Sequence, residues 1–193
     1  MDNILRLVQR TEMSHLDRGK TEFHFVKSDL NEVVSGLQDN WAATALARHL
    51  TLSFELTPDL PLIMADSSLL QQATAHLLKN AFDYSAPEGH IVCQTGVCRQ
   101  EARSWVTLSI TNSGLGLTSE ELQHVGERFF RGGAARHYKI DGTGLGLALC
   151  REIVTRHGGR LIASSEPGVT TTFSIWLEPA TTLRLKADAS VDQ

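Results

Sequence analysis

This sequence lacks the features that mark several common classes of protein. Its 193 residues carry a net charge of -4, so there is no basic surface for nucleic acid, which we do not expect as a partner. No apolar run approaches the roughly 20 residues of a membrane span, and the opening MDNILRLVQR has no signal-peptide core. We therefore expect a cytoplasmic domain, and we leave open a membrane anchor in a longer protein.

Cysteines are few, and their placement does not suggest disulfides. Cys93 and Cys98 are separated by five positions in an expected strand, which places them on opposite faces. Cys150 lies in a helical pattern, so all three are expected to be buried thiols in a reducing compartment. The histidines show neither HExxH nor CxxC spacing, which argues against a dedicated zinc site.

Apolar periodicity predicts one α/β domain. The 41% of hydrophobic and 21% of charged residues are ordinary for a globular protein. Helical spacing is found at residues 4–16, 29–45, 66–84, 118–124 and 147–156, and alternation is found at 23–27, 52–56, 90–99, 104–111, 160–165 and 171–177. Asp29 with Glu32, and Thr118 with Glu121, have the spacing of capping boxes. Strands with helices on one side predict a two-layer α/β sandwich with a mostly antiparallel sheet.

Three stretches have the residue types of a site for a nucleotide triphosphate and its metal. They are LLKNAFDYS at residues 77–85, TNSGLGL at 111–117 (the first glycine loop) and DGTGLGLAL at 141–149 (the second glycine loop). The amide oxygen of Asn80 suits Mg²⁺, and Asn112 could accept a hydrogen bond from an adenine amino group. The second glycine loop opens a helix, whose free N–H groups attract phosphate. Each stretch alone is explained as well by a helix cap, a tight turn or a hinge.

A basic segment lies between the two glycine loops. Residues 126–142 have no periodicity, and structureless segments of this length are usually functional lids or disordered. Arg131 could meet a phosphate as a bidentate donor, and Arg128, Arg136 and Lys139 lie in the same segment. A solvated basic loop explains any single one of them equally well.

In this order, the motifs resemble the catalytic ATP-binding domain of sensor histidine kinases, in the superfamily shared with DNA gyrase, MutL and the heat-shock chaperone ATPases. LLKNAFDYS resembles the N box and GERFFRG at residues 126–132 the F box, and the two glycine loops resemble the two glycine boxes. HGG at 157–159 and PGVTTTF at 167–173 match the closing pattern of that fold. The resemblance covers about residues 20–178, and the F box separates histidine kinases from the other superfamily members.

The resemblance implies a Bergerat fold that binds ATP and Mg²⁺ under a mobile lid. It implies catalytic roles for Asn80 and Arg131, with Asn80 as the metal ligand. The nucleotide site would comprise Asn80, Asp83, Tyr84, Asn112, Gly114, Gly116, Leu117, Thr143, Gly144, Leu145 and Gly146. It also implies three parts: the end of a dimerisation-domain helix or a linker helix at residues 1–19, the catalytic domain at 20–179, and a flexible tail at 180–193. A helix packed on the domain is an equal alternative for residues 1–19.

The sequence departs from the family pattern at four places. Asn112 replaces an aspartate, which keeps an acceptor for adenine but loses the charge. Asp83 stands where a basic residue is usual, and its carboxylate should repel triphosphate unless it points away or joins Mg²⁺. His76 stands where asparagine is common and where the hydrolases of the superfamily have a glutamate. No H box with a phosphoacceptor histidine is found, and we expect it upstream of this chain.

We therefore expect the catalytic part of a sensor histidine kinase. It would transfer the γ-phosphoryl group of Mg-ATP to a histidine on a separate helical hairpin, for relay to a response regulator, and would not autophosphorylate alone. The full-length protein is expected to be a homodimer. The alternative is a degenerate domain of the same fold that senses nucleotide or holds a partner without phosphoryl transfer. A serine kinase acting on an anti-sigma-type partner is a third, weaker interpretation, against which the F box argues.

Overall fold

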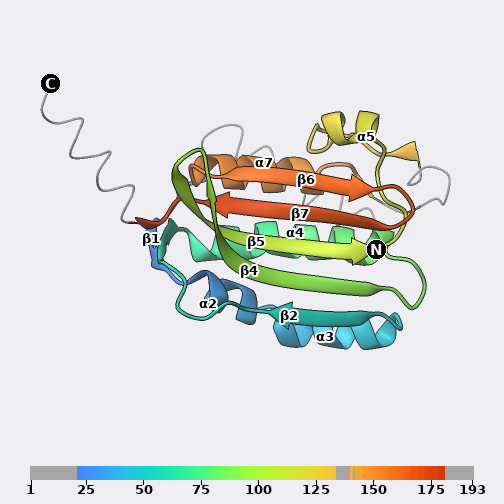
Figure 1. Ribbon diagram of the computed structural model, residues 1–193, viewed down its shortest axis with the longest axis horizontal. Coiled ribbons are helices and arrows are strands. Elements are labelled where there is room, and N and C mark those ends of the chain that lie inside the picture. Colours follow the sequence, from blue (N-terminus) through green and yellow to red (C-terminus); the bar gives the residue numbers. More distant parts are fainter. Residues whose placement is uncertain (1–20, 134–139, 141, 181–193) are drawn as a thin grey trace, which may run out of the picture.

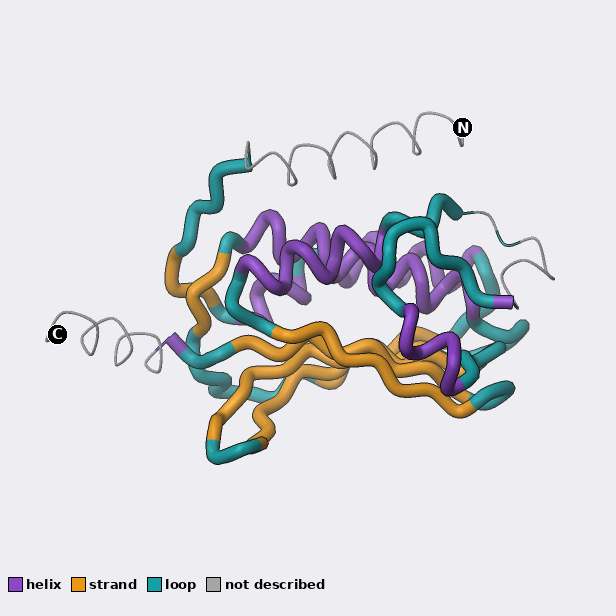
Figure 2. Tube along the Cα trace, turned by 90° about the horizontal axis from the view of Figure 1, so that it is seen from above, coloured by secondary structure: helices purple, strands orange, loops and turns teal. Residues whose placement is uncertain are grey.

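The computed structural model describes residues 21–133, 140 and 142–180, and these form two layers (Figures 1 and 2). Figure 2 shows the helical layer over one face of the strands. The strands are β1 Val26–Ser28, β2 Thr51–Glu55, β3 Ile63–Ala65, β4 His90–Gln100, β5 Arg103–Ser113, β6 Arg160–Glu166 and β7 Thr170–Leu177. The helices are α2 Leu30–Ser35, α3 Gln38–Ala47, α4 Ser67–Tyr84, α5 Ser119–His124 and α7 Gly146–Arg156. The predicted helix at residues 4–16 and the tail from 181 onward lie outside the described residues.

The main sheet has the order β2-β4-β5-β7-β6, with β2 parallel to β4 and every other neighbouring pair antiparallel. This confirms the predicted mixed, mostly antiparallel sheet and the two-layer α/β sandwich. A separate two-stranded ribbon joins β1 to β3. The sequence did not predict β3, because its three residues are too few to show an alternation.

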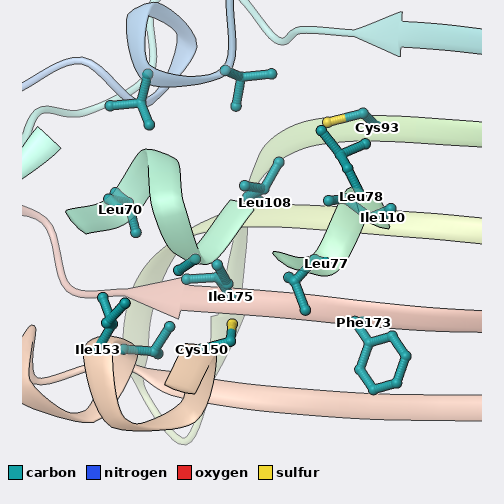
Figure 3. Packing of buried hydrophobic residues seen from close by; sticks show 14 of the residues in the cluster. Leu70, Leu77, Leu78, Cys93, Leu108, Ile110, Cys150, Ile153, Phe173 and Ile175 are labelled. Carbon is teal, nitrogen blue, oxygen red and sulfur yellow. The ribbon is translucent and has the colours of Figure 1, made fainter. Parts of the chain in front are cut away.

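The core lies between the sheet and helices α4 and α7 (Figure 3). Leu70 and Leu77 of α4 and Ile153 of α7 are fully buried against Leu108 and Ile175 of the sheet. This packing follows from the helical stripe of α4 and the alternation of β5 and β7. The core therefore fixes α4 and α7 over the sheet, and their ends carry the site.

Cys93, Cys98 and Cys150 are free thiols, and Cys93 and Cys150 are buried as predicted, whereas the predicted burial of Cys98 is wrong because this residue is only half-buried. Burial raises the pKa of Cys93 to about 12 and raises that of Cys150 further. Both thiols therefore stay protonated, which agrees with a structural role in the core.

The prediction of a single helix at residues 29–45 is wrong, because this stretch forms two helices, α2 and α3. Asp29 caps α2 as expected, but its carboxylate accepts from the N–H of Asn31 at 2.8 Å, two residues on. The break between α2 and α3 falls at Gly36, where an added methyl group would lie 2.6 Å from Nε2 of Gln71 on α4. Glycine also weakens a helix at this point.

Within the described ranges, every helix is too short or too polar to span a bilayer.

Candidate active site

A cleft of ≈ 530 Å³, part of it open to solvent, lies where α4, the inner face of the sheet and the segment after α5 meet. The lining residues are Asn80, Tyr84, Asn112, Gly116, Leu117, Val125, Phe130, Arg131, Gly132, Leu147, Thr171 and Phe173. The sequence singled out Asn80, Tyr84, Asn112, Gly116, Leu117 and Arg131 among them, and the structure brings these six together.

Asn80 reaches the cleft because it lies on the face of α4 next to the buried stripe. The carboxylate of Asp66 caps the helix by accepting from the N–H of Leu69 at 3.1 Å. Leu77 and Ala81 then face the core, and Asn80 lies on the flank between them, as the helical stripe predicted. An uncharged amide therefore stands in the cleft one turn before Tyr84.

Asn112 supplies a buried polar group with an unused donor. It lies on β5, directly opposite Thr171 of β7, and its side chain is 2% exposed. Its Nδ2 has no hydrogen-bond partner among the described residues. A buried unsatisfied donor costs roughly 1–3 kcal/mol, and native structures keep such groups mainly where a ligand or water completes them.

The first glycine loop is packed between backbone segments. An added methyl group at Gly114 would lie 2.1 Å from the carbonyl oxygen of Tyr84. At Gly116, whose φ is +68°, the same group would lie 2.6 Å from the carbonyl oxygen of Glu166. These positions require glycine because the end of α4 and the β6–β7 turn leave no room for a side chain. Gly116 and Leu117 line the cleft, whereas Gly114 does not.

The second glycine loop packs against the segment that resembles the F box. Gly144 has a φ of +70°, and its carbonyl accepts from the N–H of Phe129 at 3.0 Å. Thr143 accepts from the N–H of Leu145 at 3.1 Å, and α7 begins at Gly146. Thr143, Gly144, Leu145 and Gly146 do not line the cleft themselves, but Leu147 of the same helix does. The first turn of α7 therefore lies beside the cleft, and the free N–H groups of a helix N-terminus favour anions.

Arg131 and Tyr84 both line the cleft, Arg131 from the segment after α5 and Tyr84 from the end of α4. The guanidinium of Arg131 donates to the carbonyl of Ile140. Burial raises the pKa of the Tyr84 hydroxyl, with a smaller lowering by Arg131 and a smaller raising by Asp83. Tyr84 is therefore an uncharged donor at neutral pH. Arg128 does not line the cleft, and Arg136 and Lys139 lie outside the described residues.

The carboxylate of Asp83 is held by two cations. Arg48 of the α3 end contacts it at 3.1 Å, and Lys79, four residues earlier on α4, contacts its other oxygen. Asp83 is not among the lining residues of the cleft. The sequence predicted repulsion between this carboxylate and a triphosphate. That repulsion is reduced, because Arg48 and Lys79 balance the charge and Asp83 does not line the cleft.

His76 lies one helical turn before Asn80 and faces the start of α7. An added methyl group at Gly146 would be 3.5 Å from its Nδ1, and its Nε2 has no partner within the described part of the chain. Burial, with a smaller contribution from Lys79, lowers the pKa of His76 from 6.5 to about 4. The imidazole is therefore neutral at physiological pH.

Sequence reasoning missed half of the lining: Val125, Phe130, Gly132, Leu147, Thr171 and Phe173. Val125 and Leu147 are apolar, and nothing in their local pattern separates them from core residues, whereas Phe130 and Gly132 lie in the GERFFRG stretch but were not assigned to the site. Thr171 could have been found, because it is an inward-facing polar residue in the PGVTTTF stretch.

The family model and two curated relatives that match this chain all name histidine kinases. The model of the histidine kinase-, DNA gyrase B- and HSP90-like ATPase family matches residues 65–181. Sensor-like histidine kinase SenX3 of Mycobacterium tuberculosis is 33% identical over 146 residues, which cover 72% of this chain and 35% of SenX3. Sensor histidine kinase ZraS of Klebsiella oxytoca is 34% identical over 182 residues, which cover 90% of this chain and 37% of ZraS. This chain thus spans about a third of the length of these curated relatives.

Solved structures agree. The mycobacterial sensor histidine kinase MprB superposes with a TM-score of 0.66 at 29% identity, covering 80% of this chain and 99% of that one. Histidine kinase AdeS of Acinetobacter baumannii superposes with a TM-score of 0.70 at 20% identity, covering 90% and 77%, which shows the shared fold.

Proposed function

This chain belongs to the histidine kinase-, DNA gyrase B- and HSP90-like ATPase family, and on that premise we propose that it is the catalytic ATP-binding part of a sensor histidine kinase. The whole protein would be a homodimer that carries a phosphoacceptor hairpin outside this chain and passes phosphoryl groups to a response regulator.

One observation carries the proposal: Asn112 holds an unused, buried amide donor inside a cleft that Asn80 and Arg131 also line. The amide suits the polar edge of a purine, since the edge offers both a donor and an acceptor. Apolar neighbours such as Val125 and Phe173 suit the faces of the ring. The cleft therefore combines a site for the base with groups for phosphates.

Asn80 and Arg131 fit the triphosphate end. The neutral amide of Asn80 would hold Mg²⁺ together with phosphate oxygens, since Mg²⁺ takes few protein ligands when phosphates supply the rest. When bound, Mg²⁺ neutralises part of the phosphate charge. Arg131 and the first turn of α7, with Thr143 and Gly144 before it, would orient the phosphates and stabilise their charge.

The proposed reaction is a phosphoryl transfer between two proteins. The bond from the γ-phosphorus to the β,γ-bridging oxygen breaks and its electron pair leaves with ADP, while the lone pair of the unprotonated ring nitrogen of a hairpin histidine forms the new bond to phosphorus. The other ring nitrogen then releases its proton. This chain positions the nucleotide and balances its charge. His76 supports transfer over hydrolysis, since its neutral, buried imidazole offers no carboxylate to activate water one turn before Asn80.

The degenerate alternative is not favoured. Asp83, His76 and Asn112 together motivated it, and the carboxylate of Asp83 pairs with Arg48 and Lys79. The relatives that match are sensor histidine kinases over most of this chain.

The direct test mixes the full chain with γ-labelled ATP, Mg²⁺ and the separately expressed phosphoacceptor hairpin of MprB. We expect label on the hairpin histidine, stable in base and lost in acid, and none on this chain. The catalytic domain of MprB serves as the positive control for the hairpin. Transfer by that control but not by this chain, under conditions where this chain binds Mg-ATP, contradicts the proposal.

A further inference from the structure

Three polar side chains lie in one row across the sheet beside the cleft. Strand pairing places Asn112 of β5 opposite Thr171 of β7, and Thr171 opposite Ser165 of β6. Asn112 and Thr171 line the cleft, whereas Ser165 lies behind Thr171 and does not. Both lining residues are more than nine-tenths buried.

The hydroxyl of Ser165 has three neighbours, and they fix where its proton lies. The carbonyl of Thr170, 2.7 Å away, can only accept, so Ser165 donates its proton there. The N–H of Leu117, 2.8 Å away, can only donate, so it fills one lone pair of Ser165. The remaining neighbour is Oγ1 of Thr171 at 2.9 Å. Since Ser165 has no second proton, Thr171 must be the donor in this bond.

This count determines what Thr171 can offer a ligand. Its one proton is used toward Ser165, so the hydroxyl has only lone pairs left for the cleft. The amide of Asn112 is different, because it carries both a donor and an acceptor, and its Nδ2 has no hydrogen-bond partner in the described residues. A half-turn exchanges its oxygen and nitrogen, so Asn112 can match either a donor or an acceptor.

The two residues therefore differ in their power to select a purine. Adenine carries an amino group at C6 and an acceptor at N1, whereas hypoxanthine carries an oxo group at C6 and an N–H at N1. Asn112 can pair with both edges by turning its amide. An acceptor-only hydroxyl favours an amino group and disfavours an oxo group, since two acceptors facing each other leave both unsatisfied.

We propose that Ser165 sets the preference of this site for 6-aminopurine nucleotides by holding the proton of the Thr171 hydroxyl. The inference rests on the proposed nucleotide site and adds its specificity determinants. Thr171 contacts the base, and Ser165, which does not line the cleft, is a positioning residue. Asn112 contributes to affinity for either purine edge and little to the choice between them.

The test is calorimetric titration of the full chain with Mg-ADP and Mg-IDP, whose bases differ only in the C6 and N1 positions. We expect the wild type to bind ADP about tenfold more tightly than IDP, the effect of roughly one hydrogen bond. Ser165→Ala frees the Thr171 proton to turn toward an oxo group. The ratio of the two dissociation constants should fall to within about threefold.

Three further variants separate polarity from structure. Ser165→Thr keeps the hydroxyl and should keep the wild-type ratio. Thr171→Val removes the acceptor and should lower the ratio even if Ser165→Ala fails to fold. Ser109→Ala is the matched control, since this hydroxyl bonds to Ser174 at 2.7 Å on the opposite face of the sheet, and it should leave the ratio unchanged.

The outcomes distinguish the two proposals. If neither nucleotide binds the wild type in the presence of Mg²⁺, the proposed function itself fails. If ADP binds but the wild type does not prefer it over IDP, the inference about Ser165 is overturned. It is also overturned if Ser165→Ala weakens both nucleotides equally, because the residue would then act only by holding Leu117 in the first glycine loop.

Discussion

In the first glycine loop, a methyl group added at Gly114 would lie 2.1 Å from a backbone oxygen, whereas one added at Gly142 in the second loop would meet no atom of the described residues within 4 Å. The second loop also contains Gly144, which packs on the backbone of Phe129, and Gly146, which faces only the side chain of His76. The glycines of the first loop are thus required by close backbone packing, whereas in the second loop only Gly144 packs closely on backbone.

Helix α4 connects the two loops. Its end, Tyr84 and Ser85, packs on Gly114, and His76 lies against Gly146 two turns earlier. Asn80 stands between these contacts and lines the cleft. The comparison indicates that the first loop packs tightly against the end of α4 and supplies Asn112, Gly116 and Leu117 to the cleft, whereas the second loop packs on Phe129 and His76 and supplies Leu147.

The largest expected effect separates the two loops directly. Gly114→Ala forces α4 and the β5 end apart, and we expect a loss of about 3 kcal/mol or more in the free energy of unfolding. Gly142→Ala should change it by less than about 0.5 kcal/mol. Denaturant titration of both variants measures this. Equal losses would remove the distinction between the loops.

Acid should destabilise the fold at His76, which lies on α4 against Gly146 of the second loop. The folded-state pKa of His76 is about 4, below its ordinary 6.5, so the unfolded chain binds the extra proton between these values. Stability is therefore full above pH 6.5 and falls as pH drops toward 4, by up to roughly 3 kcal/mol for this one group. His76→Asn should flatten that pH dependence of the unfolding free energy. An unchanged slope in this variant would show that His76 is not the group responsible.

Asn80 should control metal-dependent binding without holding the fold together. Asn80→Ala is expected to weaken Mg-nucleotide affinity by roughly 10- to 100-fold. In EDTA the variant and the wild type should bind alike, as calorimetry can measure. Asn40→Ala, at an exposed asparagine of α3, is the control. An equal loss with and without Mg²⁺ would argue that Asn80 contacts the nucleotide directly.

Asp83 should give the smallest effect, although it lies only three residues from Asn80. Asp83→Asn removes partly exposed pairs with Arg48 and Lys79, which together contribute no more than about 1 kcal/mol. Nucleotide affinity should stay within about twofold of the wild type. A severalfold gain in affinity would mean that the carboxylate does face the phosphates.

Much of the fold could be predicted because its signals are local. The hairpin of β4 and β5 follows from alternation, and the cap of α5 by Thr118 and Glu121 forms as the spacing indicated. The division of the predicted helix at residues 29–45 was missed, although Gly36 lies at the break and glycine weakens a helix there.

In the site, too, residues in local motifs could be predicted, whereas contacts between distant segments could not. Asn80 and Asn112 were identified because each lies in a distinctive short motif. The pairing of Asp83 with Arg48, 35 residues away, depends on how α3 packs beside α4. The row of Asn112, Thr171 and Ser165 exists only through the register of three strands, which no local pattern encodes.

The central claim, that this cleft binds Mg-nucleotide, is tested most directly by calorimetry of the full chain with a non-hydrolysable ATP analogue, with and without Mg²⁺. We expect saturable binding at one site that weakens when Mg²⁺ is removed. If millimolar analogue gives no Mg²⁺-dependent binding, the assignment of the cleft is contradicted.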